Sequence, residues 1–514
     1  MNPSSIWLPA SQVGTFLPLS TNHTVDVVII GGGITGLTLA QRLKEAGRTV
    51  AVIEMQSIGM GATGSSTGHL TSALDIDYAS LQAKFGQSGA QEAARKSEAA
   101  IDHIESLVDS LAIACDFHRA DGWRYTEETS GEAGLVAESE VARRFGLAVE
   151  VVDGGPLPFM RRSLRFRNQA MFDPVRYVRA LANHVHGDGS YVFEKTRVEE
   201  VDGGEPNVVH AGGFTVAARH VVHATHTPIG VVLPLQLEVA PYTSYVIGVR
   251  LTGRVPPDLY WDTANPYHYI RPVHTEPDGA VLLIGGEDHK TAHESDGAAR
   301  FAALESYARS RFAVTDVAWR WAGELFQSVD GLPYFGRLGG QTSIYGATGF
   351  AGTGLTMGTA AALDIGRIIL GGDPSLSEMR PQRFKPVAAA ANFLRENASA
   401  ARHMIADRLD GPSATPVLEI PLGEGRVTMV EGRQVAVYRS ATGQLHHLSP
   451  VCPHVGGIVK WNQAGGSWDC PLHGSRFSPD GTLLAGPACE GLQRMRSKPD
   501  PGSEPEGAYG GALV

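Results

Sequence analysis

Residues 25–54 read VDVVIIGGGITGLTLAQRLKEAGRTVAVIE. The short, β-branched apolar run at residues 25–30 predicts a buried strand, and the amphipathic run at residues 34–46 predicts a helix. Gly47 ends that helix, and a second apolar run at residues 49–53 leads to Glu54. A strand, a glycine-rich turn, a helix and a second strand in this order predict the start of a parallel α/β sheet.

Three glycines between the first strand and the helix, Gly31, Gly33 and Gly36, have the G-x-G-x-x-G spacing. The first permits a tight turn, the second lets a pyrophosphate approach the backbone, and the third lets the helix pack on the strand. The phosphates then meet free N–H groups at the positive end of the helix dipole. Glu54 can accept hydrogen bonds from a ribose 2′-OH. The stretch predicts a dinucleotide site, and a glycine-rich βαβ unit without a ligand is the alternative.

The overall composition limits the classes of function. A chain of 514 residues is long enough for two or three domains. The net charge of −11 argues against a nucleic-acid partner. No apolar run is long enough for a membrane span, and the N-terminus lacks the basic and apolar regions of a secretory signal. The four cysteines do not suggest a disulfide framework, so we expect a cytoplasmic protein.

Changes in composition divide the chain into five parts. We expect a leader over residues 1–24, a dinucleotide-binding body over residues 25–373 with a β-rich substrate domain at about 239–325, and a helical linker over residues 374–416. Short strands with frequent turn signals predict a small all-β domain over residues 417–499, and residues 500–514 have the composition of a disordered tail. The expected fold class is α/β: a Rossmann-like domain with a β-rich α+β domain, plus the small all-β domain.

Five later stretches support a flavin-binding body. They are MFDPVRYVRAL at residues 171–181, TRV at 196–198, VVHAT at 221–225, DGLPYFG at 330–336 and ATGFAGTGLTMG at 347–358. Together with residues 25–54, they resemble the D-amino-acid-oxidase-like family of FAD-dependent oxidoreductases, in the expected order. One departure from that pattern is His226, which stands where the family's A-T-G motif has its glycine.

The resemblance implies non-covalent FAD. The residues that it places at the cofactor are Gly31, Gly33, Ile34, Thr35, Gly36, Glu54, Thr67, Gly68, Val198, Ala224, Thr225, Gly352, Thr353, Gly354 and Thr356.

The substrate side offers four candidate catalytic residues. His69 lies beside the expected flavin loop and is either a base, a flavin contact or a structural histidine. Tyr267, Tyr269 and Arg271 alternate along the segment NPYHYIRP and therefore share one face of an expected strand. Arg271 is interpreted as a bidentate clamp for a substrate carboxylate, or else as a surface arginine beside an aromatic ladder.

A second constellation occurs near the C-terminus. Cys452 and His454 are followed, after fifteen intervening residues, by Cys470 and His473. Two thiolates and two imidazoles can hold zinc or a Rieske [2Fe–2S] centre. The intervening residues 455–469 are not helical in pattern, which disfavours a zinc finger. The segment at residues 461–488 resembles a Rieske domain, which implies that the cysteines hold one iron and the histidines the other.

Two features distinguish this segment from many of the Rieske domains that it resembles. The positions of a loop-tying disulfide are occupied by Gly457 and Leu472, so that bridge cannot form. Ser475 is present, but Phe477 stands where high-potential members have a tyrosine. Because fewer hydroxyl groups then stabilise the reduced cluster, we predict a potential in the lower half of the range of about −150 to +300 mV.

The leading functional hypothesis combines both centres. A small-molecule substrate, an amine or amino-acid derivative, gives a hydride to FAD, and electrons leave through the Rieske cluster to an external carrier such as a ferredoxin. One alternative is a reductase or monooxygenase that receives electrons through the cluster. A second is a redox sensor or electron-transfer adaptor.

Overall fold

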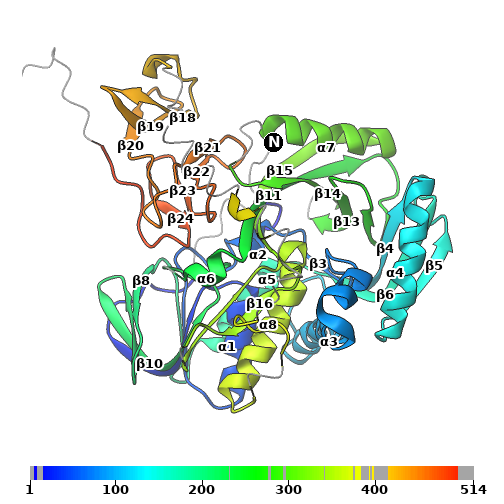
Figure 1. Ribbon diagram of the computed structural model, residues 1–514, viewed down its shortest axis with the longest axis horizontal. Helices are drawn as coiled ribbons and strands as arrows, with labels where there is room; N and C mark the ends of the chain where they lie inside the picture. Colours follow the sequence, from blue (N-terminus) through cyan, green and yellow to red (C-terminus); the bar gives the residue numbers. More distant parts are fainter. Residues whose placement is uncertain are drawn as a thin grey trace, which may run out of the picture.

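The computed structural model describes residues 5–8, 15–230, 232–275, 279–292, 297–340, 342–373, 377–383, 393, 396–398 and 415–495 (Figure 1). Two large sheets form the body, and two small antiparallel sheets form the C-terminal unit. The mixed α/β body with a small β unit confirms the predicted fold class. The expected tail, residues 500–514, lies outside the described residues, as does most of the expected helical linker.

The first sheet is built around β1 (His23–Ile30), which pairs in parallel with β2 on one side and β10 on the other. The strand order is β16-β17-β10-β1-β2-β7, with β9 attached to β10 and β8 to β9. The remaining bounds are β2 (Val50–Ile53), β7 (Tyr191–Phe193), β8 (Val198–Asp202), β9 (Asn207–Ala211), β10 (Phe214–His223), β16 (Tyr334–Arg337) and β17 (Ile344–Thr348).

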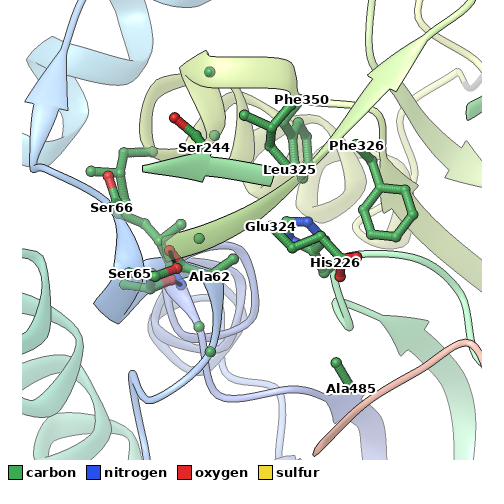
Figure 2. A pocket seen from close by; sticks show the side chains of 18 of the residues that line it. Ala62, Ser65, Ser66, His226, Ser244, Glu324, Leu325, Phe326, Phe350 and Ala485 are labelled. Carbon is green, nitrogen blue, oxygen red and sulfur yellow. Dashed lines mark hydrogen bonds between the residues drawn. The ribbon is translucent and has the colours of Figure 1, made fainter. Parts of the chain in front are cut away.

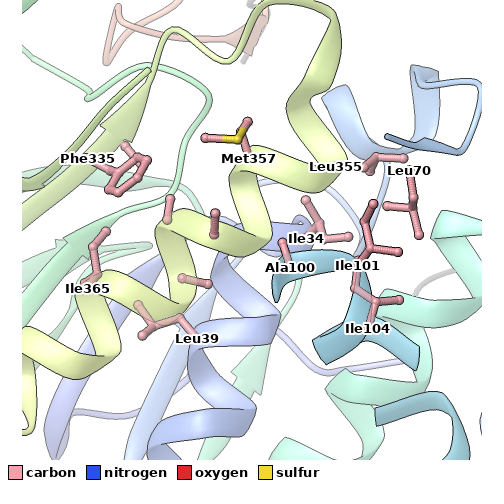
Figure 3. Close-up of a cluster of buried hydrophobic side chains, with 14 of the residues drawn as sticks. Ile34, Leu39, Leu70, Ala100, Ile101, Ile104, Phe335, Leu355, Met357 and Ile365 are labelled. Atoms are coloured by element: carbon pink, nitrogen blue, oxygen red, sulfur yellow. The ribbon is translucent and has the colours of Figure 1, made fainter. Parts of the chain in front are cut away.

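Successive residues of β1 point to opposite faces of this sheet. Val27 and Ile29 join a large cluster of buried apolar side chains, whereas Val28 and Ile30 join a separate cluster on the other face. Four helices pack on the first face: α1 (Ile34–Glu45), α3 (Tyr78–Ser110), α5 (Pro174–Val185) and α8 (Gly354–Ile369). Figure 3 shows side chains of α1, α3 and α8 meeting in this core. This packing fixes the start of α1 beside the end of β1.

The second sheet has the order β15-β11-β14-β13-β12-β4-β6-β3, with β5 paired to β6. Residues 239–325, the expected substrate domain, supply β11 to β14 and most of β15. Strands from residues 69–171 complete the sheet, a contribution that the sequence analysis did not foresee. The bounds are β3 (His69–Leu70), β4 (His118–Thr126), β5 (Val149–Asp153), β6 (Arg162–Met171), β11 (Val239–Leu251), β12 (Leu259–Asp262), β13 (His268–Thr275), β14 (Gly279–Lys290) and β15 (Val314–Ser328).

The C-terminal unit is all-β and packs around Trp468 and Phe477, which are fully buried. Its strands are β18 (Glu424–Val430), β19 (Arg433–Arg439), β20 (Leu445–Leu448), β21 (Lys460–Asn462), β22 (Ser467–Asp469), β23 (Arg476–Phe477) and β24 (Leu483–Ala485). The short and peripheral helices are α2 (Ala62–Ser65), α4 (Glu132–Arg144), α6 (Leu233–Gln236), α7 (Gly297–Arg311), η1 (Thr129–Gly131), η2 (Ala351–Thr353) and η4 (Val417–Glu419). Within the described part of the chain, no helix has the length and apolar character needed to span a bilayer.

Candidate active site

The glycine turn between β1 and α1 is closely packed. Gly31 has a φ of +107°, and a Cβ there would lie 2.5 Å from the carbonyl oxygen of Ala224. A Cβ at Gly36 would lie 2.1 Å from the carbonyl oxygen of Gly31. These two positions therefore exclude any side chain. Gly31 and Gly33 line a large cavity, whereas Gly36 does not and serves the packing of α1 on β1.

Glu54 stands at the end of β2 and faces the same cavity. Its Oε2 accepts a hydrogen bond of 2.8 Å from the N–H of Gly32, and its Oε1 accepts one of 2.8 Å from the N–H of Gln56. Burial raises the pKa of this carboxyl, while the two N–H groups lower it. The carboxylate is thus fixed in direction and keeps lone pairs that can accept from a ribose hydroxyl.

The cavity has a volume of about 760 Å³ and runs between the two large sheets. Most of the cofactor residues expected from the sequence line it. They are Gly31, Gly33, Ile34, Thr35, Glu54, Thr67, Val198, Ala224, Thr225, Gly352, Thr353 and Gly354. Three others do not: Gly36, Gly68 and Thr356. The hydroxyl of Thr356 instead accepts a hydrogen bond of 3.1 Å from the N–H of Thr71. Because Thr71 lines the cavity, this bond stabilises the cavity wall.

His226 also lines the cavity, and it has a φ of +69° at the place of the family's glycine. Its ring lies 4.7 Å from the ring of Phe326, and its Nε2 is buried without a hydrogen-bond partner among the described residues. Burial lowers the pKa of His226 to about 4. The narrow glycine turn, the fixed carboxylate and this enclosed wall fit a dinucleotide of the size of FAD.

Three of the four candidate catalytic residues meet at the cavity: His69, Tyr267 and Tyr269. The ring of His69 lies edge-on to that of Tyr269 at 5.8 Å, and its Nδ1 is 3.0 Å from the hydroxyl of Thr67. Burial, reinforced by the charge of Arg271, lowers the pKa of His69 to about 3. His69 is therefore neutral near pH 7 and is a poor proton acceptor there.

Arg271, the fourth candidate, does not line the cavity. Its Nη1 donates to the carbonyl oxygens of Gly68, at 2.7 Å, and Phe172, at 3.1 Å. Its Nε donates to the carbonyl oxygen of Pro272 at 3.0 Å, and its guanidinium lies 5.4 Å from the ring of Trp7. The side chain is 3% exposed, so it is neither the surface arginine nor the free clamp that the sequence suggested. It holds the loop that carries His69.

Two charged residues that the sequence analysis did not single out line the cavity together with His69, Tyr267 and Tyr269. This part of the cavity is called the substrate end below. Asp75 lies between β3 and α3, and Arg124 lies on β4. The guanidinium of Arg124 makes no hydrogen bond or ion pair with another described residue. The one sequence signal for Arg124 is a charge between two aromatic residues of the strand, Trp123 and Tyr125, which are both buried.

The four expected metal ligands lie on two loops of the C-terminal unit that have the same local geometry. In the first loop, the N–H of Gly456 donates to the carbonyl oxygen of Cys452 at 3.0 Å. In the second loop, the N–H of Gly474 donates to the carbonyl oxygen of Cys470, also at 3.0 Å. The rings of His454 and His473 lie 5.1 Å apart at 81°. The structure therefore places the two histidine rings side by side, and the thiols of Cys452 and Cys470 are hydrogen-bonded to each other. Among the described residues, no three of these side chains are close enough to hold a single metal ion.

The donor set fits an iron–sulfur cluster. Nε2 of His454 and Nδ1 of His473 are buried and have no hydrogen-bond partner among the described residues. Burial lowers the pKa of His473 to about 4, which favours the neutral imidazole that a metal requires. Backbone N–H groups approach the thiols of both Cys452 and Cys470, and the hydroxyl of Ser475 approaches the thiol of Cys452. A Cβ at Gly457 would lie 2.8 Å from the side chain of Leu472, so apolar packing takes the place of a loop-tying disulfide.

The C-terminal unit also forms part of the cavity wall. Its contributing residues are Ala464, Gly465, Arg476, Leu483, Leu484, Ala485, Gly486 and Ala488. The carbonyl oxygen of Leu484 accepts a hydrogen bond of 3.0 Å from Nε2 of Gln56, two residues beyond Glu54. Figure 2 shows Ala485 below Glu324 and His226 at this wall. The two units therefore enclose one site between them.

Comparisons with known proteins agree with this arrangement. Residues 26–368 match the family described as FAD dependent oxidoreductase, and residues 413–496 match the Rieske [2Fe-2S] domain. A putative Rieske 2Fe-2S iron-sulfur protein, YhfW of Bacillus subtilis (strain 168), is 28% identical over 96% of this chain and 97% of its own length.

Two further proteins are similar to the body of the chain. The γ-glutamylputrescine oxidoreductase of Escherichia coli (strain K12) is 26% identical over 70% of this chain and 87% of its own length. Among solved structures, a glycine oxidase from Geobacillus kaustophilus superposes with a TM-score of 0.59 at 18% identity, covering 70% of this chain and 99% of its own.

Proposed function

The chain belongs to the family of FAD dependent oxidoreductases and carries a Rieske domain, and from this premise we propose that it oxidises a small amine or amino-acid derivative and passes the electrons through the Rieske domain to an external acceptor. FAD supplies hydride acceptance when bound, and the [2Fe–2S] cluster supplies one-electron transfer.

The observation that carries this proposal is the contact between the ligand-bearing loop and the cavity wall. Gly474 directly follows the ligand His473, and a Cβ at Gly474 would lie 2.7 Å from Oε1 of Glu324 and 3.0 Å from Cζ of Phe326. Both Glu324 and Phe326 line the cavity. A cluster site that is separated from the cavity by one layer of side chains is well placed for electron exchange.

The substrate end of the cavity supports an amine or amino-acid derivative. The guanidinium of Arg124 is available to a carboxylate, which it can bind bidentately. The tyrosines Tyr267 and Tyr269, with rings 5.8 Å apart, offer an apolar wall with hydroxyl groups. The E. coli relative is named for γ-glutamylputrescine, which is an amine.

Anaerobic stopped-flow spectroscopy tests the proposal. Glycine, L-proline, putrescine and γ-glutamylputrescine are mixed in turn with the purified protein, and the absorbance of the flavin is followed. We expect at least one of them to bleach the flavin within seconds. If none does, while a reduced ferredoxin bleaches it, electrons enter through the Rieske domain and the proposed direction is wrong.

The Cys470→Ser variant tests the role of the cluster. We expect it to retain flavin bleaching by the amine and to lose more than about 95% of turnover with a one-electron acceptor, because one iron loses a thiolate ligand. The matched control is Cys489→Ser, a cysteine of the same domain outside the ligand set. Unchanged turnover in Cys470→Ser would contradict the proposal.

A further inference from the structure

Asp75 is an acidic side chain that lines the cavity beside the glycine-rich turn at residues 349–354. Asp75 is exposed because it faces the open space of the cavity. The protein surrounds it on its other sides. Its Oδ2 accepts a hydrogen bond from the N–H of Gly352. Gly352 belongs to the glycine-rich turn that the family resemblance places at the flavin. Asp75 therefore lies where a substrate held against that turn would meet it.

The surroundings of Asp75 are well defined. A Cβ at Gly352 would lie 3.0 and 3.1 Å from the two carboxylate oxygens of Asp75 and 3.1 Å from the hydroxyl oxygen of Tyr267. Asp75, Tyr267 and the backbone of Gly352 thus converge on one point. Oδ1 of Asp75 makes no hydrogen bond with a described residue and remains available as an acceptor.

Four charged or titratable groups interact electrostatically with Asp75. Arg124 on β4 is the cation, Tyr267 and Tyr269 are two phenols, and Asp288 on β14 is a second carboxyl close to both tyrosines. Burial raises the pKa of Asp288 to about 7, although the hydroxyl groups of Ser244 and Tyr267 oppose the rise. Burial also raises the pKa of Asp75, although the N–H of Gly352 and the charge of Arg124 oppose the rise.

We propose that Asp75 is the proton acceptor that converts the ammonium group of the substrate into the free amine. The inference rests on the proposed function, since it presupposes an amine substrate. An ammonium nitrogen has no lone pair with which to stabilise the carbon that loses a hydride, so its proton must leave first. In the proton-transfer step one N–H bond breaks and one O–H bond forms on Asp75, and no electrons are exchanged.

Three other titratable groups in or beside the cavity suit this role less well. His69 is a weak base because its pKa is about 3. Asp262 lines the cavity, but its oxygens are engaged by the backbone N–H of His268 at 2.9 Å and by Nδ1 of the same residue at 2.8 Å. Asp288 does not line the cavity. Asp75 combines an accessible carboxylate with a fixed orientation.

The test is the pH dependence of flavin bleaching in Asp75→Asn, measured anaerobically with an amine that bleaches the wild-type flavin. The amide keeps the hydrogen bond from Gly352 but cannot accept a proton. At pH 7 we expect the bleaching rate to fall about 100-fold. Near pH 10, where the free amine is abundant in solution, the two rates should agree within about threefold. Parallel pH profiles for the two proteins would overturn the inference.

A matched control and a binding measurement keep the result interpretable. Asp77→Asn changes a carboxylate two residues away that caps α3 by accepting from the N–H of Ser80 at 2.7 Å, and asparagine caps equally well. Its pH profile should follow the wild type.

tert-Butylamine has no hydrogen on its α carbon, so it binds without reacting. Its dissociation constant, read from the flavin spectrum at pH 7, should rise about tenfold in Asp75→Asn.

The outcomes separate the two proposals. If no amine bleaches the wild-type flavin, the proposed function fails and the role of Asp75 falls with it. If amines bleach the wild type but the Asp75→Asn profile is unchanged, only the role of Asp75 is wrong. Retained flavin content and an unchanged circular dichroism spectrum show that the variant is folded.

Discussion

The nucleotide end and the substrate end of the cavity are built in different ways. Residues 25–54 alone supply the glycine turn, the helix start and Glu54 at the nucleotide end. The substrate end draws on the segment before α3, on β4 and on residues 267–269, which are far apart in the sequence. Backbone geometry defines the first region, whereas side-chain charge defines the second. We therefore expect substitutions in the two regions to damage different properties.

The largest expected effect belongs to the nucleotide end. Gly31→Ala places a Cβ 2.5 Å from a carbonyl oxygen in a residue with a positive φ, so the turn must open. We expect the bound flavin to fall below about a tenth of the wild-type content and the free energy of unfolding to fall by about 2–4 kcal/mol. The ratio of flavin to protein absorbance and chemical denaturation measure these changes.

Gly47→Ala is the matched control, because Gly47 has a φ of +77° but no atom within 4 Å of an added Cβ. It should lose only about 1 kcal/mol of stability and keep its flavin. Equal loss of flavin in both variants would show that backbone strain, rather than close packing at the cofactor, governs this region.

The next largest effects are expected for substitutions of two arginines. One substitution should weaken ligand binding, and the other should lower the stability of the fold. Arg124→Gln should weaken the binding of a carboxylate ligand such as benzoate by about 10- to 100-fold, because charge-assisted hydrogen bonds contribute about 1.5–3 kcal/mol. Its free energy of unfolding should change by less than about 0.5 kcal/mol, because the guanidinium forms no hydrogen bond or ion pair with a described residue. Difference spectra of the flavin and chemical denaturation provide the two measurements.

Arg271→Gln should behave in the opposite way. It removes three hydrogen bonds to buried carbonyl oxygens, so we expect a loss of about 3 kcal/mol of stability. If Arg271→Gln instead weakened benzoate binding without a loss of stability, the carboxylate clamp would be Arg271, as the sequence first suggested.

These two arginines show where sequence reasoning ends. The glycine spacing, Glu54 and the four expected cluster ligands could be located from the sequence because each set lies within a short segment whose geometry is local. Arg271 was chosen because strand alternation places it beside Tyr269, but alternation does not reveal that Gly68 and Phe172 bring their carbonyl oxygens to it. Asp75 and Arg124 come together only when β4 joins the second sheet, a long-range pairing that no local pattern predicts.

The smallest expected effect concerns the cluster potential. The hydroxyl of Ser475 approaches the thiol of Cys452, and the buried Phe477 has no hydroxyl to offer. Ser475→Ala should lower the midpoint potential by about 50–100 mV, the equivalent of one hydrogen bond to a charged sulfur. Phe477→Tyr should raise it. Redox titration followed by electron paramagnetic resonance measures both, and a wild-type potential above about +150 mV would contradict the prediction.

The central claim is that electrons taken from a substrate at one end of this cavity leave through the Rieske domain that forms part of its wall. Rapid freeze-quench electron paramagnetic resonance tests it directly, after anaerobic mixing of the protein with an amine that bleaches its flavin. The signal of the reduced Rieske cluster should grow as the flavin absorbance falls. A bleached flavin beside a cluster that stays oxidised would contradict the account.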